Sequence, residues 1–112
     1  MRQGSEVSGR DRPERKEASL HALASYLERA LDKAVSVIMM RHAANVCTVY
    51  LGDPSGPREE LRRLATIDAS LEDEMLRLTS SGLNRLEIGG QPYRFVRSFT
   101  QIEGTAAVVF SA

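Results

Sequence analysis

The C-terminal stretch of the chain, residues 82–112, constrains the fold more than any other part of the sequence. The dipeptide Gly89-Gly90 separates two runs in which apolar and polar residues alternate, and two glycines in such a place are typical of a two-residue hairpin turn. A second turn signal, Gln101–Gly104, precedes a further apolar run. We therefore predict three consecutive antiparallel strands, at Arg85–Ile88, Gln91–Thr100 and Thr105–Ser111.

The turn lengths also predict how these strands pair. The two-residue turn places Leu86 opposite Tyr93, and a four-residue loop after the second strand places Phe95 opposite Phe110. Successive side chains on a strand point to opposite faces, so one face is predicted to be the core. That face would hold Leu86, Ile88, Tyr93, Phe95, Phe99, Ala106, Val108 and Phe110. The other face would hold Arg85, Glu87, Arg94, Val96, Ser98, Ala107, Val109 and Ser111.

A helix is predicted upstream of this sheet. Pro13 suits the first turn of a helix, where its fixed φ and missing N–H are tolerated. From there apolar residues recur at steps of three and four, which is the pattern of an amphipathic helix. These residues are Leu20, Leu23, Leu27, Ala30, Leu31 and Ala34. The first residues are mostly polar and charged, so we expect a disordered tail over residues 1–13 and a single domain over residues 14–112.

The segment after this helix has two interpretations. β-Branched residues crowd both Val35–Arg41 and Asn45–Leu51, which favours a hairpin of two strands. The residues between these runs lack glycine, however, and residues 39–44 are mostly helix formers. The alternative is therefore a first helix that continues to Ala44 and leaves one strand. We favour the hairpin.

A second helix is predicted between Pro57 and Gly82. Pro57 follows a loop rich in glycine and proline, and Gly82 suits the left-handed conformation that ends a helix. Two acids, Asp68 and Glu72, fall within the apolar stripe if this helix is continuous. Otherwise the helix breaks just before Ser70 and restarts there, where the sequence resembles a capping box.

The predicted order of elements is α-β-β-α-β-β-β. This order predicts an α+β domain with a mostly antiparallel sheet and two main helices. The alternative with the longer first helix is α-β-α-β-β-β. The favoured order resembles that of the roadblock-like and profilin-like architectures. This resemblance of element order implies a scaffold, an adaptor or a sensor.

Composition and charge disfavour several classes of protein. The 112 residues suffice for one domain. Lys+Arg and Asp+Glu are both 15, whereas a nucleic-acid-binding protein usually has a basic excess. No apolar run is long enough to span a membrane, the first residues do not form a secretory signal, and one cysteine allows no internal disulfide. We expect a small bacterial-type domain in the cytoplasm, with neither membrane nor nucleic acid among its partners.

Few residues are candidates for catalytic chemistry. In the hairpin interpretation Cys47 and His42 lie near each other across the turn, and a Cys–His pair can activate a thiol. No third orienting residue accompanies them, and a lone cysteine in an apolar strand usually packs as a small core residue. His21 and His42 are far apart in the sequence, and no metal-binding spacing occurs. We therefore expect no catalysis, no cofactor and no metal.

Arg97 interrupts the predicted apolar face of the sheet, where the four-residue loop places it opposite Val108. A buried guanidinium needs a partner, because an unpaired buried charge is costly. The acids expected to face the sheet from the second helix are Asp68 and Glu72, so we predict an ion pair between Arg97 and one of them. The alternative is that Arg97 lies at the sheet margin and extends its charged end to water.

The opposite face of the sheet is the candidate for partner binding. Arg85 lies opposite Arg94 there, and Val96 and Val109 add apolar surface. If both helices pack on the other face, these four residues are exposed and would bind a protein partner or a second copy of the chain. If each helix covers one face, the apolar residues belong to the core.

The sequence leads to three hypotheses about function. The favoured hypothesis is a non-enzymatic protein-interaction or scaffold module that acts through the open face or edge of the sheet. The second is a small-ligand or regulatory sensor with a pocket between helix and sheet. The third is a phage-type structural joining protein, because residues 88–95 are similar to the strand–turn–strand of small phage head–tail joining proteins.

Overall fold

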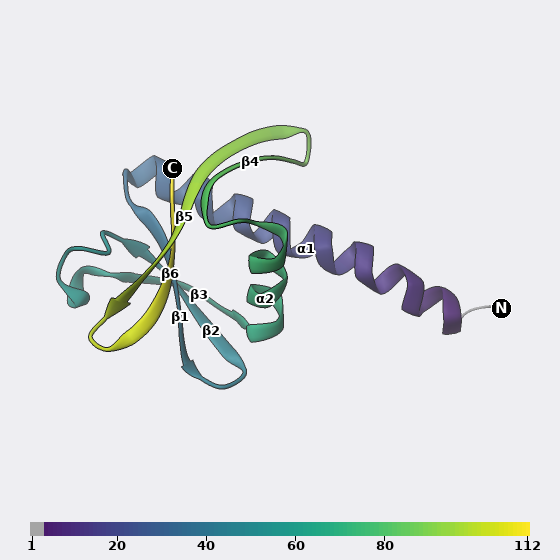
Figure 1. Cartoon of the computed structure of the whole chain (residues 1–112), viewed down its shortest axis with the longest axis horizontal. Helices are drawn as coiled ribbons and strands as arrows, with labels where there is room; N and C mark the ends of the chain where they lie inside the picture. The colour runs from purple at the N-terminus through teal and green to yellow at the C-terminus, as the bar shows by residue number, and fades with distance from the viewer. Residues whose placement is uncertain (1–3) are drawn as a thin grey trace.

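A computed structural model describes residues 4–112, with side chains described from residue 16 onward (Figure 1). Over this range the elements follow the order α-β-β-β-α-β-β-β, with one six-stranded antiparallel sheet in the order β3-β2-β1-β6-β5-β4. The predicted α+β fold with an antiparallel sheet and two main helices is therefore confirmed. The elements are α1 Gly4–Lys33, β1 Ser36–Ala43, β2 Val46–Gly52, the 3-10 turn η1 Arg58–Glu60, β3 Arg62–Asp68, α2 Ala69–Leu78, β4 Gly82–Ile88, β5 Gln91–Ile102 and β6 Thr105–Ser111.

Helix α1 begins at Gly4 rather than at the predicted Pro13. Its N-terminal part extends away from the sheet (Figure 1). The predicted disordered tail, residues 1–13, lies outside the residues whose side chains the structure describes, and its disorder stays a prediction.

The buried stripe of α1 contains residues that the spacing predicts, among them Leu23, Leu27 and Ala30. The helix ends where Ala34 takes a left-handed conformation, with φ of 57°. The N–H of Val35 then donates to the carbonyl oxygen of Ala30 at 3.0 Å, which is the bond that closes a Schellman motif. The chain turns directly from this motif into β1.

Strands β1 and β2 form the predicted hairpin, so the alternative of a longer first helix is wrong. Strand β1 also pairs with β6, which places it in the middle of the sheet. A central strand that is covered on both faces has apolar residues at successive positions, and residues 37–40 are all buried. This burial explains why the run would be apolar on every side of a helix.

The prediction of a second helix is wrong over its first half. Residues 58–60 form a 3-10 turn, residues 62–68 form β3, and α2 begins only at Ala69. The alternative in which the helix starts near Ser70 therefore describes α2 better than the continuous helix does. Strand β2 accounts for β3: residues 47–52 are buried, so their backbone groups need partners on both sides, and β3 supplies one side. This pairing overrides the local helix propensity.

The first hairpin of the C-terminal sheet has the predicted register, with Leu86 opposite Tyr93. The second hairpin does not. Strand β5 extends to Ile102, and the turn consists of only Glu103 and Gly104, with φ of 51° and 81°. A non-glycine residue rarely takes positive φ, so the sequence favours the longer loop that we predicted.

The shorter turn places Arg97, rather than Phe95, opposite Phe110. The shift is even, so it leaves each side chain on its predicted face. Phe95 and Phe110 are both buried, and their ring centroids lie 5.8 Å apart. Two residues that were predicted to be core are exposed, however: Phe99, with 60% of its surface accessible, and Ala106.

Both helices pack on one face of the sheet, here called the helix face (Figure 1). Its core is mostly aliphatic. The buried members are Leu23, Leu27, Ala30, Val37, Met39, Cys47, Val49, Leu51, Met75, Phe95, Val108 and Phe110. The opposite face, here called the outer face, has a second and smaller core. Its members are Ile38, Met40, Tyr50, Ile102, Ala107 and Val109, with Leu61 packed against them.

The loop before β3 and the turn after β5 cover the core of the outer face. Leu61 lies so close to β2 that a Cβ added to Gly52 would meet its Cδ2 at 2.5 Å. The guanidinium of Arg58 lies 5.0 Å from the centroid of the Tyr50 ring and reaches Glu103 at 4.0 Å. These contacts cover only the β1, β2 and β6 part of the outer face.

Candidate interaction surface

Some residues of the outer face are therefore buried and others are exposed. Of the four predicted partner-binding residues, one is buried and three are exposed. Val109 has only 3% of its surface accessible and belongs to the smaller core, so it is not available to a partner. Val96 is 43% accessible, and Arg85 and Arg94 are exposed. The structure thus brings three of the four residues together on β4 and β5 and separates Val109 from them.

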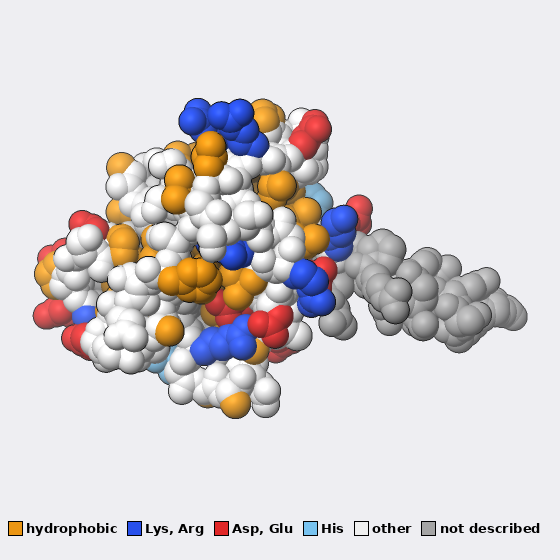
Figure 2. All heavy atoms as spheres, viewed as in Figure 1, with side chains coloured by type: hydrophobic (Ala, Val, Ile, Leu, Met, Phe, Trp, Pro, Cys, Tyr) orange, Lys and Arg blue, Asp and Glu red, His pale blue; other side chains and the backbone are white. Residues whose placement is uncertain are grey.

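Strands β4 and β5 form a continuous exposed patch, here called the β4–β5 outer surface. It consists of Leu83, Arg85, Glu87, Pro92, Arg94 and Val96. Leu83 lies directly opposite Val96 and is 50% accessible. Figure 2 shows basic side chains beside hydrophobic ones over the β4–β5 hairpin. Leu83 was not predicted to belong to this surface, because the strand was predicted to begin only at Arg85.

The predicted pairing of Arg85 with Arg94 is confirmed. Two like charges directly opposite each other on adjacent strands are mildly destabilising, and no ion pair of the described residues involves either arginine. Glu87 is the acid diagonal to Arg94 on the same face. The surface therefore combines an exposed apolar pair with arginines whose charge is free to meet a partner.

The patch reaches one edge of the sheet, because β4 is the last strand in the described order. Its one strand neighbour is β5, to which it is joined by Gly89 and Gly90 with φ of 60° and 83°. Positive φ at both positions defines a type I′ turn, which is one of the two turn types usual in the two-residue hairpin that was predicted. The backbone groups on the other side of β4 form an open edge, and an open edge is a template for another strand.

The structure does not bring Arg97 together with Asp68 or Glu72, which corrects the predicted ion pair. The Nη1 group of Arg97 instead donates to the carbonyl oxygens of Leu76 and Thr79, at 2.8 and 3.0 Å. Basic side chains often bind the free carbonyls at the end of a helix in this way. Arg97 thus ties the end of α2 to β5.

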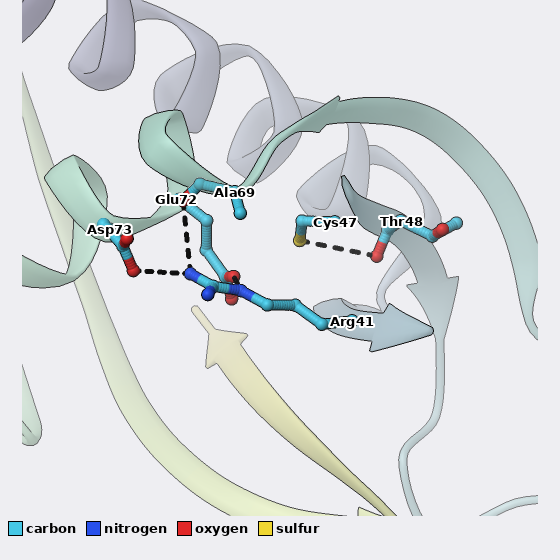
Figure 3. Close-up of polar contacts among 6 residues, drawn as sticks. All are labelled: Arg41, Cys47, Thr48, Ala69, Glu72 and Asp73. Carbon is cyan, nitrogen blue, oxygen red and sulfur yellow. Dashed lines mark hydrogen bonds and ion pairs between the residues drawn. The ribbon is translucent and has the colours of Figure 1, made fainter. Parts of the chain in front are cut away.

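Glu72 pairs with a residue that the sequence interpretation overlooked. Figure 3 shows Arg41 between Glu72 and Asp73: its Nε donates to Glu72 and its Nη2 to Asp73, both at 2.5 Å. A third bond joins Arg41 to the carbonyl oxygen of Ala69 at 3.2 Å. The hydrogen bonds to Asp73 and Glu72 raise the pKa of Arg41 well above its ordinary value. Alternation along β1 places Arg41 on the same face as Met39, and this signal could have revealed the pair.

Cys47 and His42 do not form a catalytic pair. Cys47 lies buried in the core of the helix face, with its Sγ directed at the carbonyl oxygen of Thr48 (Figure 3). Burial, with a smaller contribution from the charge of Glu72, raises the pKa of the Cys47 thiol to about 12. The Nε2 atom of His42 lies 3.0 Å from the hydroxyl of Tyr50, which belongs to the core of the outer face. The thiol is therefore protonated and inaccessible near neutral pH.

Among the described residues, no cluster of three or more His, Cys, Asp or Glu side chains has the geometry of a metal site. The described helices likewise include none with the length and apolar character that crossing a membrane requires. No protein-family model matches the chain, and neither the curated proteins nor the solved structures that were compared give a match. The β4–β5 outer surface and its edge are therefore the features of the molecule that bear on its function.

Proposed function

We propose that this chain is a non-enzymatic protein-interaction module that docks its partner on the β4–β5 outer surface. One observation carries the proposal: Leu83 and Val96 lie directly opposite each other and stay about half exposed. Val109 and the other members of the smaller core on the same face are covered. An apolar pair that the fold leaves open beside a free edge suits a partner.

The charges around the apolar pair support the same proposal. Arginine is enriched at protein interfaces, because its guanidinium binds carboxylates and packs on apolar groups. Arg85 and Arg94 flank Leu83 and Val96 on the adjacent positions of the two strands. The partner of this surface is a protein or a second copy of the chain rather than a nucleic acid, in keeping with the zero net charge. The single buried cysteine suits the cytoplasm as the place of action.

Sedimentation velocity over a wide concentration range tests the proposal. We expect the mass of the wild-type protein to rise with concentration, because a second copy is the simplest partner, and we expect Val96→Glu to remain a monomer. Thr66→Glu is the matched control, since Thr66 is exposed on β3 at the opposite edge of the sheet. Self-association of Val96→Glu equal to that of the wild type would contradict the proposed surface.

A second candidate function, a small-ligand sensor, is favoured by a hollow on the helix face. The hollow has a volume of about 320 Å³ and lies where α2 meets β1, β5 and β6. Its apolar walls include Met39, Leu76, Phe99 and Val108, and the Arg41–Asp73 ion pair also lines it. A thermal-shift screen with small apolar compounds tests this function: stabilisation that is lost in Phe99→Ala supports it, and a screen without any stabilising compound rejects it.

A further inference from the structure

We infer that a second copy of the chain binds at the open edge of the β4–β5 outer surface, where the two β4 strands pair antiparallel about a two-fold axis at Leu86. This inference rests on the proposed function, because it names the partner that binds at the edge of the same surface. Strand β4 is the last strand in the described order of the sheet, so one of its two edges has no strand neighbour.

The two edges of the sheet differ in their defences against such pairing. Strand β3 has a bulge opposite the Val49–Tyr50 step of β2, and two adjacent arginines, Arg62 and Arg63, lie on this bulged strand. Bulges and charges are the usual means by which proteins keep edge strands from pairing. Strand β4 pairs with β5 in one unbroken register and contains no proline, and its two charged residues, Arg85 and Glu87, are of opposite sign. The β4 edge is therefore the one that is able to accept another strand.

The backbone of β4 restricts the pairing. The turn closes on Ile88 and Gln91, and the closing pair of a two-residue turn is hydrogen-bonded. Hydrogen-bonded and non-hydrogen-bonded pairs alternate along an antiparallel ladder. The residues that direct their N–H and C=O groups toward β5 are therefore Asn84, Leu86 and Ile88. Those that direct these groups to the open edge are Leu83, Arg85 and Glu87.

A second β4 must pair open-edge residues with open-edge residues, and the charges then select among the registers that remain. An axis at Arg85 or at Glu87 places two like charges directly opposite each other, which is destabilising. An axis at Asn84 places Leu83 opposite the partner's Arg85 and leaves Glu87 without an opposite charge. An axis at Leu86 places Arg85 opposite the partner's Glu87, and the two-fold symmetry repeats this pair. Only this last register pairs all four charges with opposite ones.

The side chains at the centre and the ends of the strand fit the same register. Leu86 lies opposite the partner's Leu86 as a non-hydrogen-bonded pair, whose Cα atoms approach to about 4.5 Å. Leu86 is half-buried in the monomer and packs against the core of the helix face, so the second copy extends that core. Leu83 lies opposite the partner's Gly89, which has no side chain to obstruct it. The pairing therefore uses the length of β4 from Leu83 to the turn.

Exchange of the two charges tests the register. Arg85→Glu places two glutamates opposite each other in each pair, and Glu87→Arg places two arginines opposite each other. We expect each single variant to raise the dimer Kd, measured by sedimentation, about tenfold or more. The double variant Arg85→Glu/Glu87→Arg restores opposite charges, and we expect its Kd to return to within about threefold of the wild type. Additive weakening in the double variant would overturn the register.

A cysteine at the two-fold axis gives an independent test. Leu86→Cys places two thiols within reach of a disulfide, whereas Leu83→Cys, the control on the same strand, places them far apart. With diamide as oxidant, which takes up the two protons and two electrons, we expect a covalent dimer from Leu86→Cys alone. The native Cys47 is buried and stays out of the reaction, as the wild type will show.

The possible outcomes separate this inference from the proposed function. A dimer that Val96→Glu disrupts, but that Leu86→Cys does not cross-link, keeps the interaction surface and overturns the edge pairing. Cross-linking of Leu83→Cys in place of Leu86→Cys overturns the register and keeps the edge. A wild-type protein that remains a monomer at the highest concentration overturns the pairing, and leaves the β4–β5 outer surface to be tested with a different protein.

Discussion

Two apolar valines on the outer face, Val96 and Val109, have opposite surroundings although alternation along the strands places them on the same face. Val109 lies on a central strand beneath the loop before β3 and the turn after β5, and it is buried. Val96 lies one strand farther out, beyond the reach of that cover, and it is exposed. The comparison teaches that alternation assigns a residue to a face, whereas the loops decide whether that part of the face is core or surface.

The largest effect is expected from Val109→Asp. A carboxylate in the core of the outer face would lie among Ile38, Met40 and Ala107 without a partner. We therefore expect a loss of about 3 kcal/mol or more in the free energy of unfolding. Urea denaturation followed by circular dichroism measures it. A Val109→Asp variant as stable as the wild type would mean that the loop before β3 and the turn after β5 do not cover Val109 in solution. Val109 and Val96 would then not differ in exposure.

Cys47 is buried in the core of the helix face, so its titration reports on a residue that is covered from solvent. Its pKa is raised from about 9 to about 12, so the folded protein holds the thiol proton to higher pH than the unfolded chain does. The resulting stability is present in full below pH 9 and decreases as the pH rises through 12. We expect the wild type to lose more stability than Cys47→Ala over this interval in urea titrations. Parallel curves for the two proteins would show that the thiol is solvated.

Leu61→Ala removes part of the cover without changing the sheet beneath it. Leu61 is half-buried against the core of the outer face, so we expect a loss of about 1–2 kcal/mol and stronger binding of a hydrophobic dye such as ANS. Leu31→Ala is a control, because Leu31 is 57% exposed on α1. Equal losses of unfolding free energy in the two variants would show that Leu61 does not shield the core of the outer face.

The smallest effect on stability is expected from Val96→Asp. On the β4–β5 outer surface a carboxylate stays in water, so we expect the free energy of unfolding of the monomer to change by no more than about 0.5 kcal/mol. This measurement, made at low protein concentration, separates folding from association. A large loss from Val96→Asp would show that Val96 is buried in the monomer and would remove the contrast with Val109.

The parts of the fold that the sequence predicts are those that short-range chemistry determines. The register of β4 and β5 follows from Gly89 and Gly90, because two adjacent glycines specify one turn type. The register of β5 and β6 depends on Glu103 in a left-handed conformation, which no residue preference indicates. Strand β3 was missed for a similar reason: its pairing with β2 outweighs a helical pattern in its own sequence.

The candidate site was predictable only in part. Alternation placed Arg85, Arg94 and Val96 on one face, and the structure keeps them together. The exposure of Leu83 follows from the position of β4 at the end of the sheet, which depends on long-range strand order. The partners of Arg97 and Glu72 were wrong because they depend on where α2 begins, and a helix that starts at Ala69 carries its acids to Arg41.

The strand order has a consequence for how the chain folds. Each half of the sheet, β1-β2-β3 and β4-β5-β6, is a meander of neighbours in sequence, and the β1–β6 ladder alone joins them. Hairpins close quickly, whereas a ladder between residues 37–40 and 107–110 must wait for a long loop to close. During synthesis, the buried residues of β1 thus lack one neighbour until β6 has left the ribosome. The nascent chain has an apolar strand edge at its centre, and the late arrival of β6 determines when that edge is protected from aggregation.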